Sequence, residues 1–511
     1  MAKFYVTTAI DYANGDQHIG HAYEKIGADA IARYRRLRGD DVHFLTGLDE
    51  HGQKVAQAAA DRGVPPQAFV DDIASRFETM WERLSISYDQ FIRTTQASHK
   101  VGVRALIERI HATSPDDFYE KSYEGWYCVG CELFKRDNEI ENGKCVLHPT
   151  RTLEWTTERN WFFRLTRYES FLKAYFAERP EFLSPESRRN EVLSLLDQGL
   201  EDISITRSKL TWAIPFPLPL STGEQQGTWV WFDALPNYLT ATGYPAEGFL
   251  DRWPAQLHVI GKDITRLHSV IWPAMLRAAD LPLPDQVWAH GFISFEGQRF
   301  SKSAGVWVEL DQAVDFRGAD ALRYFLLREA PFDGDGDFSW RRFEERYNSD
   351  LANALGNLAS RVVAMIEKYC DGVTPRNGDD ALDRADAADL AEYHTALDGS
   401  RGYLLHEALK RVMASVSRGN EFVQASQPWA LAKQAENRTK LESVLASIAR
   451  QLARHAIHLA PFMPNKAQEL WAQLGGPGRV EDQRFAGVAA LDVGGWRVTK
   501  GASLFPKPPT Q

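Results

Sequence analysis

The chain has 511 residues, of which 44% are hydrophobic and 25% are charged, a composition typical of globular proteins with several domains. It contains no run of about 18 apolar residues, which argues against a membrane-spanning helix, and its start lacks the apolar region of a secretory signal, so we expect a cytoplasmic protein. The net charge of −10 argues weakly against a nucleic-acid partner, because phosphate contacts require Lys and Arg, yet a locally positive stripe would meet that requirement.

The predicted fold begins with a strand, a turn and a helix. Residues 4–8 are β-branched and aromatic, as in a buried parallel strand, and residues 11–16 have turn composition. Apolar residues at helical spacing follow, so His18 and His21 lie at the start of a helix. The N–H groups there favour bound phosphate, and Gly20 allows a flat ring to approach the backbone closely.

A second strand and two further helices extend this pattern. Residues 41–47 predict the strand, and Asp49 follows at its carboxyl end, where ligands bind in open α/β sheets. Helical spacing over 69–84 and 101–112, with a short strand between them at 90–93, completes the first half of a doubly wound domain. A lone histidine at a helix start is more often a cap than a catalytic residue, so the function of this region depends on a partner motif.

Three of the four cysteines lie close together in sequence with one histidine. Cys128 and Cys131 are separated by two residues, and so are Cys145 and His148. This spacing is typical of a knuckle that turns twice around one tetrahedral ion, and because all four positions are filled the predicted zinc is structural. The alternative is a coincidental thiol cluster in a hairpin. The remaining Cys370 is expected to be a small core residue at a helix end.

Sequence typical of a buried sheet returns after this region. Residues 228–233, 257–261 and 287–292 predict three further strands. Asp263 follows the second of these, where it is suited both to cap the next helix and to accept a ribose hydroxyl. His268 lies about one helical turn further on and is placed to face the same cleft.

The rest of the chain is predicted to be helical. From residue 351 to residue 474, apolar residues repeat at helical spacing and indicate a helix bundle. The acidic, alanine-rich residues 379–389 are predicted to form an exposed connection within it. The proline-rich tail at 505–509 cannot continue a helix and is expected to lie extended on the surface.

A second motif, far from the first in sequence, supports a functional role for the two histidines. Residues 299–303, Arg-Phe-Ser-Lys-Ser, follow a predicted strand and put Lys302 on a small-residue loop suited to holding phosphates. Together with residues 18–21 they resemble the two motifs of class I aminoacyl-tRNA synthetases. With the turn at 261–263 and the segment 229–234, the whole chain resembles the methionyl-tRNA synthetases, in which the second motif normally begins Lys-Met where this chain has Arg-Phe.

This resemblance implies the fold. It implies a Rossmann-type parallel-sheet catalytic domain in the α/β class, split by a zinc-knuckle connective insertion and followed by an α-helical-bundle anticodon-binding domain. The expected domains are the first catalytic half (1–117), the connective insertion (118–226), the second catalytic half (227–298), the lysine-motif loop with the stem-contact region (299–350), and the anticodon-binding domain with its tail (351–511).

The resemblance also implies the activity. It implies ATP-dependent activation of L-methionine to methionyl-adenylate and transfer to the 3′ end of initiator and elongator methionine tRNA, with Mg²⁺ accompanying ATP, one structural Zn²⁺ and a monomeric enzyme. The positions expected to act in catalysis are His18, His21 and Lys302. Those expected to bind ATP are Tyr12, Asn14, Gly20, Gly261, Asp263, Arg299, Ser301 and Lys302. Those expected to bind methionine are Ile10, Tyr12, Asp49, Trp231, Tyr238, Ile264 and His268. The zinc ligands would be Cys128, Cys131, Cys145 and His148, and the anticodon would be read by Asn353, Asn357, Arg361 and Trp429.

Three rival functions stay open. A class I synthetase for another amino acid would share the motifs, although no thiolate lies near Tyr12 in sequence to bind a cysteine substrate. A catalytically silent RNA-binding paralogue would be expected to lose His18, His21, Asp49 or Lys302, and all four are present. A generic nucleotidyltransferase would not need the anticodon-type bundle.

Overall fold

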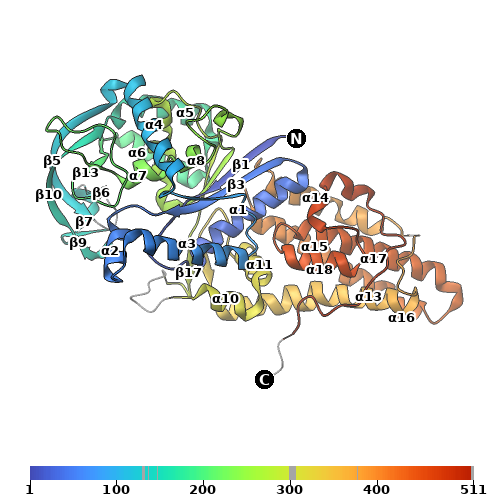
Figure 1. The fold of residues 1–511 in the computed structure, drawn as a ribbon. Coiled ribbons are helices and arrows are strands. Elements are labelled where there is room, and N and C mark those ends of the chain that lie inside the picture. Colours follow the sequence, from blue (N-terminus) through green and yellow to red (C-terminus); the bar gives the residue numbers. More distant parts are fainter. Residues whose placement is uncertain (129–132, 136, 147, 299–306, 377, 508–511) are drawn as a thin grey trace.

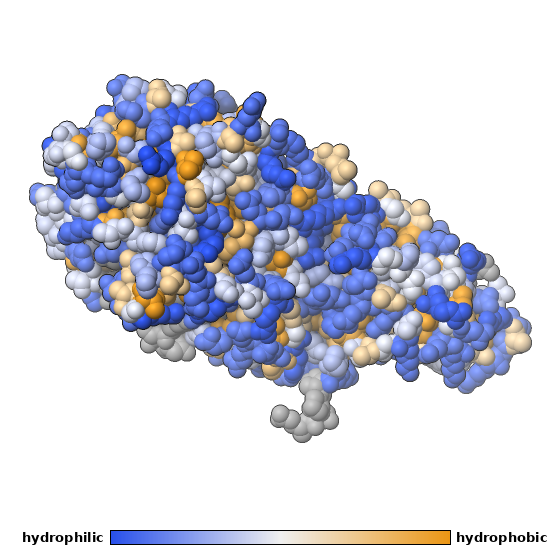
Figure 2. Space-filling model, viewed as in Figure 1, coloured by the Kyte–Doolittle hydropathy of each residue, from blue (hydrophilic) through white to orange (hydrophobic). Residues whose placement is uncertain are grey.

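The computed structural model describes residues 1–128, 133–135, 137–146, 148–298, 307–376 and 378–507. Figure 1 shows an α/β part, which carries the N-terminus and a β-rich insertion, beside an elongated helical part that leads to the C-terminus. In Figure 2 most of the same face is hydrophilic, with small and separate hydrophobic patches. Both predicted components, a parallel-sheet core and a helix bundle, are therefore present.

The α/β part is built on one parallel sheet of seven strands. The strands are β11 (Leu183–Ser184), β16 (Val287–His290), β15 (Leu257–Gly261), β1 (Lys3–Thr8), β3 (Asp41–Asp49), β4 (Gln90–Arg93) and β2 (Asp11–Tyr12). The main strands lie in the order β16-β15-β1-β3-β4 and all pair in parallel. This is the order of a doubly wound fold, whose ligands bind outside the carboxyl ends where the strand order reverses, here beside β1 and β15.

Helices from the first half of the chain pack on this sheet. They are α1 (Ile19–Arg38), α2 (Gln53–Asp61), α3 (Pro66–Arg83) and α4 (Ala97–Thr113). α1 ends at Gly39, whose φ of 93° suits a glycine. α1 is buried along most of its length, because the helical part covers its other side; for example, the Tyr34 hydroxyl lies 3.2 Å from His394 Nδ1.

The insertion is organised by a long antiparallel pair of strands. β5 (Phe118–Cys128) pairs with β10 (Glu154–Phe163), with β6 (Leu133–Phe134) and β12 (Ile203–Ser204) at the two edges. A small second sheet is formed by β7 (Ile140–Glu141), β8 (Lys144–Cys145) and β9 (His148–Thr152). The chain returns to the core sheet through α5 (Glu169–Glu178), β11 and α6 (Glu186–Gln198), and β13 (Thr206–Arg207) then pairs with β14 (Gly227–Thr228).

The helical part shares a core with the α/β part. Its connecting region holds β17 (Ile293–Phe295), α10 (Leu310–Arg317), α11 (Ala319–Glu329), β18 (Gly336–Phe338) and α12 (Trp340–Arg346); the bundle itself is α13 (Asn357–Tyr369), α14 (Ala381–Leu397), α15 (Leu405–Ser426), α16 (Pro428–Leu431), α17 (Arg438–Leu459) and α18 (Pro464–Gln473). Arg323 of α11 is fully buried; it pairs with Asp29 of α1 at 2.6 Å and donates to the Phe462 carbonyl at 2.8 Å. This side chain ties the first helix of the sheet to the end of the bundle.

One predicted strand is wrong. Residues 228–233 do not extend the sheet, because β14 ends at Thr228 and the chain turns at Trp229 into α7 (Val230–Ala234). A short apolar run is shared by buried strands and buried helices, so composition alone does not separate them.

Two predictions about the helical part are also wrong. Residues 379–389 are not an exposed connection, because α14 covers most of them and turns acidic side chains inward; Asp386, only 1% exposed, pairs with Arg418 of α15. The start of the tail is not on the surface either. Phe505 is buried and its ring meets Tyr347 edge-on at 6.1 Å.

Candidate active site

One pocket at the carboxyl ends of the core strands collects the residues predicted for methionine binding. Four chain segments reach it: the stretch after β1, the end of β3, helices α7 and α8 (Asn237–Thr240), and the turn after β15. The lining of the pocket includes all seven predicted side chains, Ile10, Tyr12, Asp49, Trp231, Tyr238, Ile264 and His268. Its remaining lining residues, Ala9, Ala234, Leu235 and Asn237, were not among the positions predicted to bind methionine.

Tyr238 and His268 form a hydrogen-bonded pair in this pocket. His268 Nδ1 lies 3.0 Å from the carbonyl oxygen of Ile264 and so carries the proton donated there, which leaves Nε2 to accept from the Tyr238 hydroxyl at 2.7 Å. Burial lowers the pKa of His268 to about 4 and raises the pKa of Tyr238 well above its usual range. Both side chains are therefore uncharged near neutral pH, and Asp49 brings the one carboxyl group of the lining.

Asp49 lies at the end of β3, and only 2% of it is exposed. The turn after it is held by Trp212, whose Nε1 donates to the Glu50 carbonyl at 2.6 Å and whose own carbonyl accepts from Gly52 N at 3.0 Å. The Glu50 side chain pairs with Arg93 at 2.5 Å. A buried carboxylate held in an otherwise uncharged pocket is suited to bind an ammonium group.

A second buried carboxylate joins the two sides of the pocket. Asp233 of α7 accepts from His51 Nδ1 at 2.6 Å and from His99 Nε2 at 2.9 Å. Burial opposes its ionisation, but these histidines outweigh that effect and lower the pKa of Asp233 to about 2. His51 follows Asp49 by two residues and Asp233 follows Trp231 by two, so the network fixes one wall of the pocket against the other. The sequence does not predict it, because His51 and Asp233 are 182 residues apart.

The two predicted histidines cap α1. Gly20 N donates to His18 Nδ1 at 3.0 Å, His18 N donates to His21 Nδ1 at 3.3 Å, and the rings stack with centroids 3.8 Å apart. Since a backbone N–H occupies each Nδ1, the proton of each neutral ring is on Nε2. Burial and the nearby Lys25 lower the pKa of His21 to about 3. A Cβ at Gly20 would lie 2.9 Å from His18 Cε1, so the stacked rings require glycine. Ring N–H donors at a helix N-terminus suit an anionic ligand.

Other residues predicted for ATP binding lie at neighbouring strand ends. Tyr12 ends β2, and Asn14 is exposed in the turn that follows. Gly261 ends β15, and a Cβ there would lie 2.8 Å from Asp263 Oδ1. Asp263 lies inside a 3₁₀ turn, so its predicted helix-capping role is wrong; Gly261 occupies the capping position.

The second phosphate motif, with Arg299, Ser301 and Lys302, lies outside the described residues. The description resumes at Trp307, whose ring meets His18 edge-on with centroids 5.5 Å apart. The chain that leaves the second motif therefore passes beside the first one.

A cluster of buried charges supports the site from within. Lys25 of α1, which is fully buried, pairs with Asp11 at 2.6 Å and with Glu24 at 2.8 Å, and donates to the Ala9 carbonyl at 3.0 Å. Glu24 also pairs with His290 at 3.0 Å. Burial opposes the ionisation of Glu24, but Lys25 and His290 outweigh it and lower its pKa to about 2. The cluster fixes the segment after β1, which carries Ile10 and Tyr12; sequence reasoning missed it, because helix periodicity does not distinguish a buried lysine from an exposed one.

The structure describes part of the predicted zinc knuckle. Cys128 and Cys145 are buried, at 0% and 1% exposure, and belong to one small cluster with Leu153. Cys131 and the side chain of His148 lie outside the described residues, and among the described ones no group of three or more metal-ligating side chains gathers. Two buried thiols in one cluster fit a site that a metal completes.

The residues predicted to read the anticodon lie at one end of the bundle. Asn357 and Arg361 are on α13, and the Arg361 guanidinium lies 5.7 Å from the ring centroid of the half-buried Trp429. Asn353 is exposed, like Asn357, but lies in a π-helical segment, so its offset from Asn357 is not the regular α-helical turn.

None of the helices in the described part of the chain combines the length and apolarity needed to cross a bilayer. Comparisons with known proteins identify the family. The family model described as tRNA synthetases class I (M) matches residues 4–149 and 136–363.

Whole-chain relatives point to the same family. The "Methionine--tRNA ligase" of Caldanaerobacter subterraneus subsp. tengcongensis is 42% identical over 99% of this chain and 78% of its own length, and that of Thermosynechococcus vestitus is 42% identical over 97% and 93%. The solved Mycobacterium tuberculosis methionyl-tRNA synthetase in complex with methionyl-adenylate superposes with a TM-score of 0.93, at 39% identity and over 99% of this chain and 100% of that one. The chain belongs to the methionyl-tRNA synthetases, ligases of class I.

Proposed function

We propose that this protein activates L-methionine with ATP and then transfers it to the 3′ end of methionine tRNA, using the pocket between β1, β3, α7 and the turn after β15. The observation that carries the proposal is the convergence of seven side chains of the methionine-binding pattern on that pocket. The name of the relatives and the methionyl-adenylate bound to the Mycobacterium protein support the same reaction.

The pocket would hold methionine by charge at one end and by shape at the other. Asp49 would pair with the ammonium group. Tyr12, Trp231 and Ile264 would enclose the thioether, and sulfur–aromatic contacts contribute about 1 kcal/mol. The Tyr238–His268 pair is uncharged, so it would accommodate an apolar side chain without leaving a buried charge unpaired.

Activation would be an in-line displacement at the α-phosphate. The methionine carboxylate is already ionised and attacks phosphorus directly, while pyrophosphate leaves, so no general base is required. The Nε2–H groups of His18 and His21 would donate to phosphate oxygens, Asp263 would hold the ribose, and Lys302 would offset the charge on pyrophosphate. In the second step a ribose hydroxyl at the 3′ end of tRNA attacks the carbonyl carbon, and AMP leaves.

Mg²⁺ would arrive with ATP and neutralise part of the phosphate charge. In nucleotide sites Mg²⁺ is usually bound by substrate phosphates together with one or two carboxylates, so we expect ATP to supply most of its contacts.

Several finer features are proposals of the same kind. The Zn²⁺ would be structural, held by Cys128, Cys131, Cys145 and His148, and would order the connective insertion over residues 118–226. Arg361 and Trp429, with Asn353 and Asn357, would read the anticodon, where stacking on an aromatic ring is worth roughly 1–3 kcal/mol per base. We expect a cytoplasmic protein. We also expect a monomer, and gel filtration at assay concentration would check that oligomeric state.

Charging of methionine tRNA with labelled methionine tests the proposal. With ATP and Mg²⁺ we expect methionyl-tRNA, AMP and pyrophosphate, and Lys302→Ala should slow activation by about 100-fold or more, because it removes charge stabilisation from the transition state. Lys500→Ala, an exposed lysine of the tail region, is the matched control and should charge normally. A Lys302 variant with full activity would refute its assigned role. A wild-type protein that binds tRNA without charging it would favour the silent paralogue.

A further inference from the structure

Two short paired strands lie close to the start of the second phosphate motif. β17 pairs in parallel with β18, with Ser294 opposite Asp337. After β17 the chain makes a tight turn, in which the backbones of Phe295 and Gln298 exchange two hydrogen bonds of 2.8 and 3.0 Å. Gln298 is the last residue that the structure describes before the motif, so contacts that hold this turn also fix the point from which the motif starts.

Two aspartates, Asp335 and Asp337, bind this segment, and we call them the carboxylate clip. Asp337 Oδ1 accepts from Ser294 Oγ at 2.5 Å and from the backbone N–H of Gly297 at 2.8 Å. Asp335 Oδ1 accepts from the backbone N–H of Phe292 at 2.8 Å. The carboxylate clip therefore holds the backbone just before β17 and just after it.

Asp335 also binds the turn after β15. Lys262 donates to both of its carboxylate oxygens, at 2.8 and 2.6 Å, and the Lys262 ammonium lies 4.7 Å from the ring centroid of Phe292. Partial burial opposes the ionisation of Asp335, but the hydrogen bonds from Lys262 and Phe292 outweigh it and lower the pKa of this carboxyl. Lys262 directly precedes Asp263, the residue assigned to the ribose, so Asp335 joins the ribose turn (residues 261–264) to the segment that enters the second motif.

The loop that carries the carboxylate clip lies directly on the backbone of that segment. A Cβ at Gly291 would clash with the carbonyl oxygen of Gly334, so this close approach requires glycine. Gly336 N donates to the carbonyl of Phe292 at 2.8 Å. A shift of the loop would therefore move the strand that leads to the motif.

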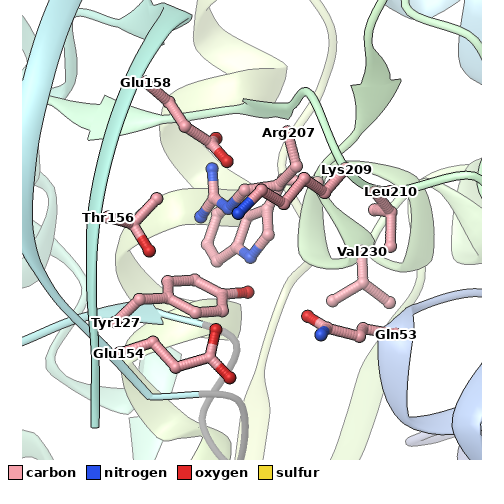
Figure 3. A pocket seen from close by; sticks show the side chains of 10 residues that line it. Gln53, Tyr127, Glu154, Thr156, Glu158, Arg207, Lys209, Leu210 and Val230 are labelled. Carbon is pink, nitrogen blue, oxygen red and sulfur yellow. The ribbon is translucent and has the colours of Figure 1, made fainter.

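The bonds of the carboxylate clip join distant parts of the chain, whereas other charged groups are held locally. Figure 3 shows Glu154 and Glu158 opposite Arg207 and Lys209 across the hollow between the insertion and the α/β core. Arg207 donates there to carbonyls of residues 204–206, in its own segment. The partners of the carboxylate clip are instead 40 to 73 residues away in sequence, so its bonds set the position of one segment against another.

The spacing that the carboxylate clip fixes matters for a reaction of ATP. In the proposed function Asp263 holds the ribose and Lys302 offsets the charge on pyrophosphate, and both groups belong to one nucleotide. The two residues must therefore be held at one spacing, because a misplacement of about 1 Å can lower a rate by about 100-fold.

We propose that Asp335 and Asp337 are positioning residues for adenylate formation, which set the start of the second motif against the ribose turn. They act through Lys262 and through the turn at Gly297, and neither contacts the substrate. This inference deepens the proposed function and rests on it for the reaction.

The test is methionine-dependent ATP–pyrophosphate exchange, with kcat and both KM values measured. Asp337→Ala should lower kcat about tenfold or more and leave the methionine KM within about twofold of wild type. Asp337→Asn should keep kcat within about twofold, because its amide oxygen can accept both hydrogen bonds that Asp337 Oδ1 accepts. The matched control is Asp492→Ala in the tail, which removes another carboxylate that accepts from a glycine N–H, at 2.8 Å, and should leave kcat unchanged. Equal kcat values in the Asp337→Ala and Asp337→Asn proteins would overturn the proposal.

A second comparison separates positioning from a general loss of structure. If the carboxylate clip acts by placing the second motif, Asp337→Ala should lower kcat by less than about twofold further in a protein that already carries Lys302→Ala. The same loss in both backgrounds would contradict the proposal. Exposed ion pairs contribute little to stability, so the unfolding temperature of Asp335→Asn should fall by less than about 3 °C while its kcat falls about threefold; an unchanged kcat would refute the role of Asp335.

The outcomes distinguish this inference from the proposed function. Absence of exchange in the wild-type protein would refute the proposed function, and this inference with it. Normal exchange in both the wild-type and the Asp337→Ala proteins would refute this inference alone.

Discussion

Replacing Asp233 with alanine should damage the proposed methionine pocket without removing a group that would contact the substrate. Asp233 is fully buried and accepts two hydrogen bonds, at 2.6 and 2.9 Å, from His51 and His99. Hydrogen bonds to a charged group contribute about 1.5–3 kcal/mol each, so Asp233→Ala should cost about 3–6 kcal/mol of stability in the α/β part. The pKa of Asp233, lowered to about 2, independently indicates that the folded state favours the carboxylate by about 2–3 kcal/mol above pH 4, a contribution lost as the pH falls through 2.

The functional effect follows from where the network ends. Asp233 fixes α7, which carries Trp231, to the turn that follows Asp49, and a loss of only 1.4 kcal/mol of methionine binding corresponds to tenfold. We therefore expect the KM for methionine in ATP–pyrophosphate exchange to rise about tenfold or more in Asp233→Ala. In Asp233→Asn, which keeps the shape of the side chain, the logarithm of the KM should rise about half as much. The matched control is Asp386→Ala, which removes another buried, paired carboxylate but lies in the bundle. Equal methionine KM values in the wild-type and Asp233→Ala proteins, measured at a temperature where both are folded, would refute this reasoning.

Four other predictions address the remaining parts of the site. His18→Asn should keep the cap of α1, because an asparagine oxygen accepts the same N–H, yet lower exchange by about 100-fold; normal exchange would show that the ring does no more than cap the helix. His268 is kept neutral in the folded state, with a pKa lowered from 6.5 to about 4, so its contribution of about 3 kcal/mol to stability is present above pH 6.5 and is lost as the pH falls toward 4. In urea titrations, the free energy of unfolding should therefore fall less between pH 6.5 and pH 4 in His268→Gln than in the wild-type protein. The same fall in both proteins would contradict this. Trp429→Ala should raise the KM for tRNA about tenfold with unchanged exchange, whereas parallel losses in both assays would assign the ring to the core. Elemental analysis should find one zinc per chain in the wild-type protein and less in Cys128→Ser; equal zinc in both would remove that ligand from the site.

Much of the fold could be predicted because its signals are local. The first strand and α1 follow from a β-branched run and from helical spacing, and β3 and β15 follow in the same way. The prediction for residues 228–233 is wrong because the two-residue strand ends at Thr228 and Trp229 caps a helix, an outcome that depends on the surrounding core. Residues 379–389 look polar enough for a loop, but their carboxylates pair with arginines on α15 and α17, partners that a local pattern does not contain.

The residues of the site show the same difference between local and long-range signals. The side chains that would touch substrate, such as Asp49 and Trp231, were predictable through short motifs in order along the chain. The residues that hold them were not, because Asp233, His51 and His99 meet only in the folded chain, and the buried Lys25 has the same sequence context as a lysine on a helix surface. Long-range pairing is therefore the information that the sequence motifs lacked.

The most direct test of the central claim is ATP–pyrophosphate exchange with a panel of amino acids in the absence of tRNA. The pocket built from Asp49, Trp231, Tyr238 and His268 predicts exchange with methionine well above that with leucine, isoleucine, valine or cysteine, and a methionine KM raised about tenfold or more in Asp49→Asn. Exchange driven best by another amino acid would keep the fold and contradict the pocket assignment, and no exchange with any of them would contradict the account of the reaction itself.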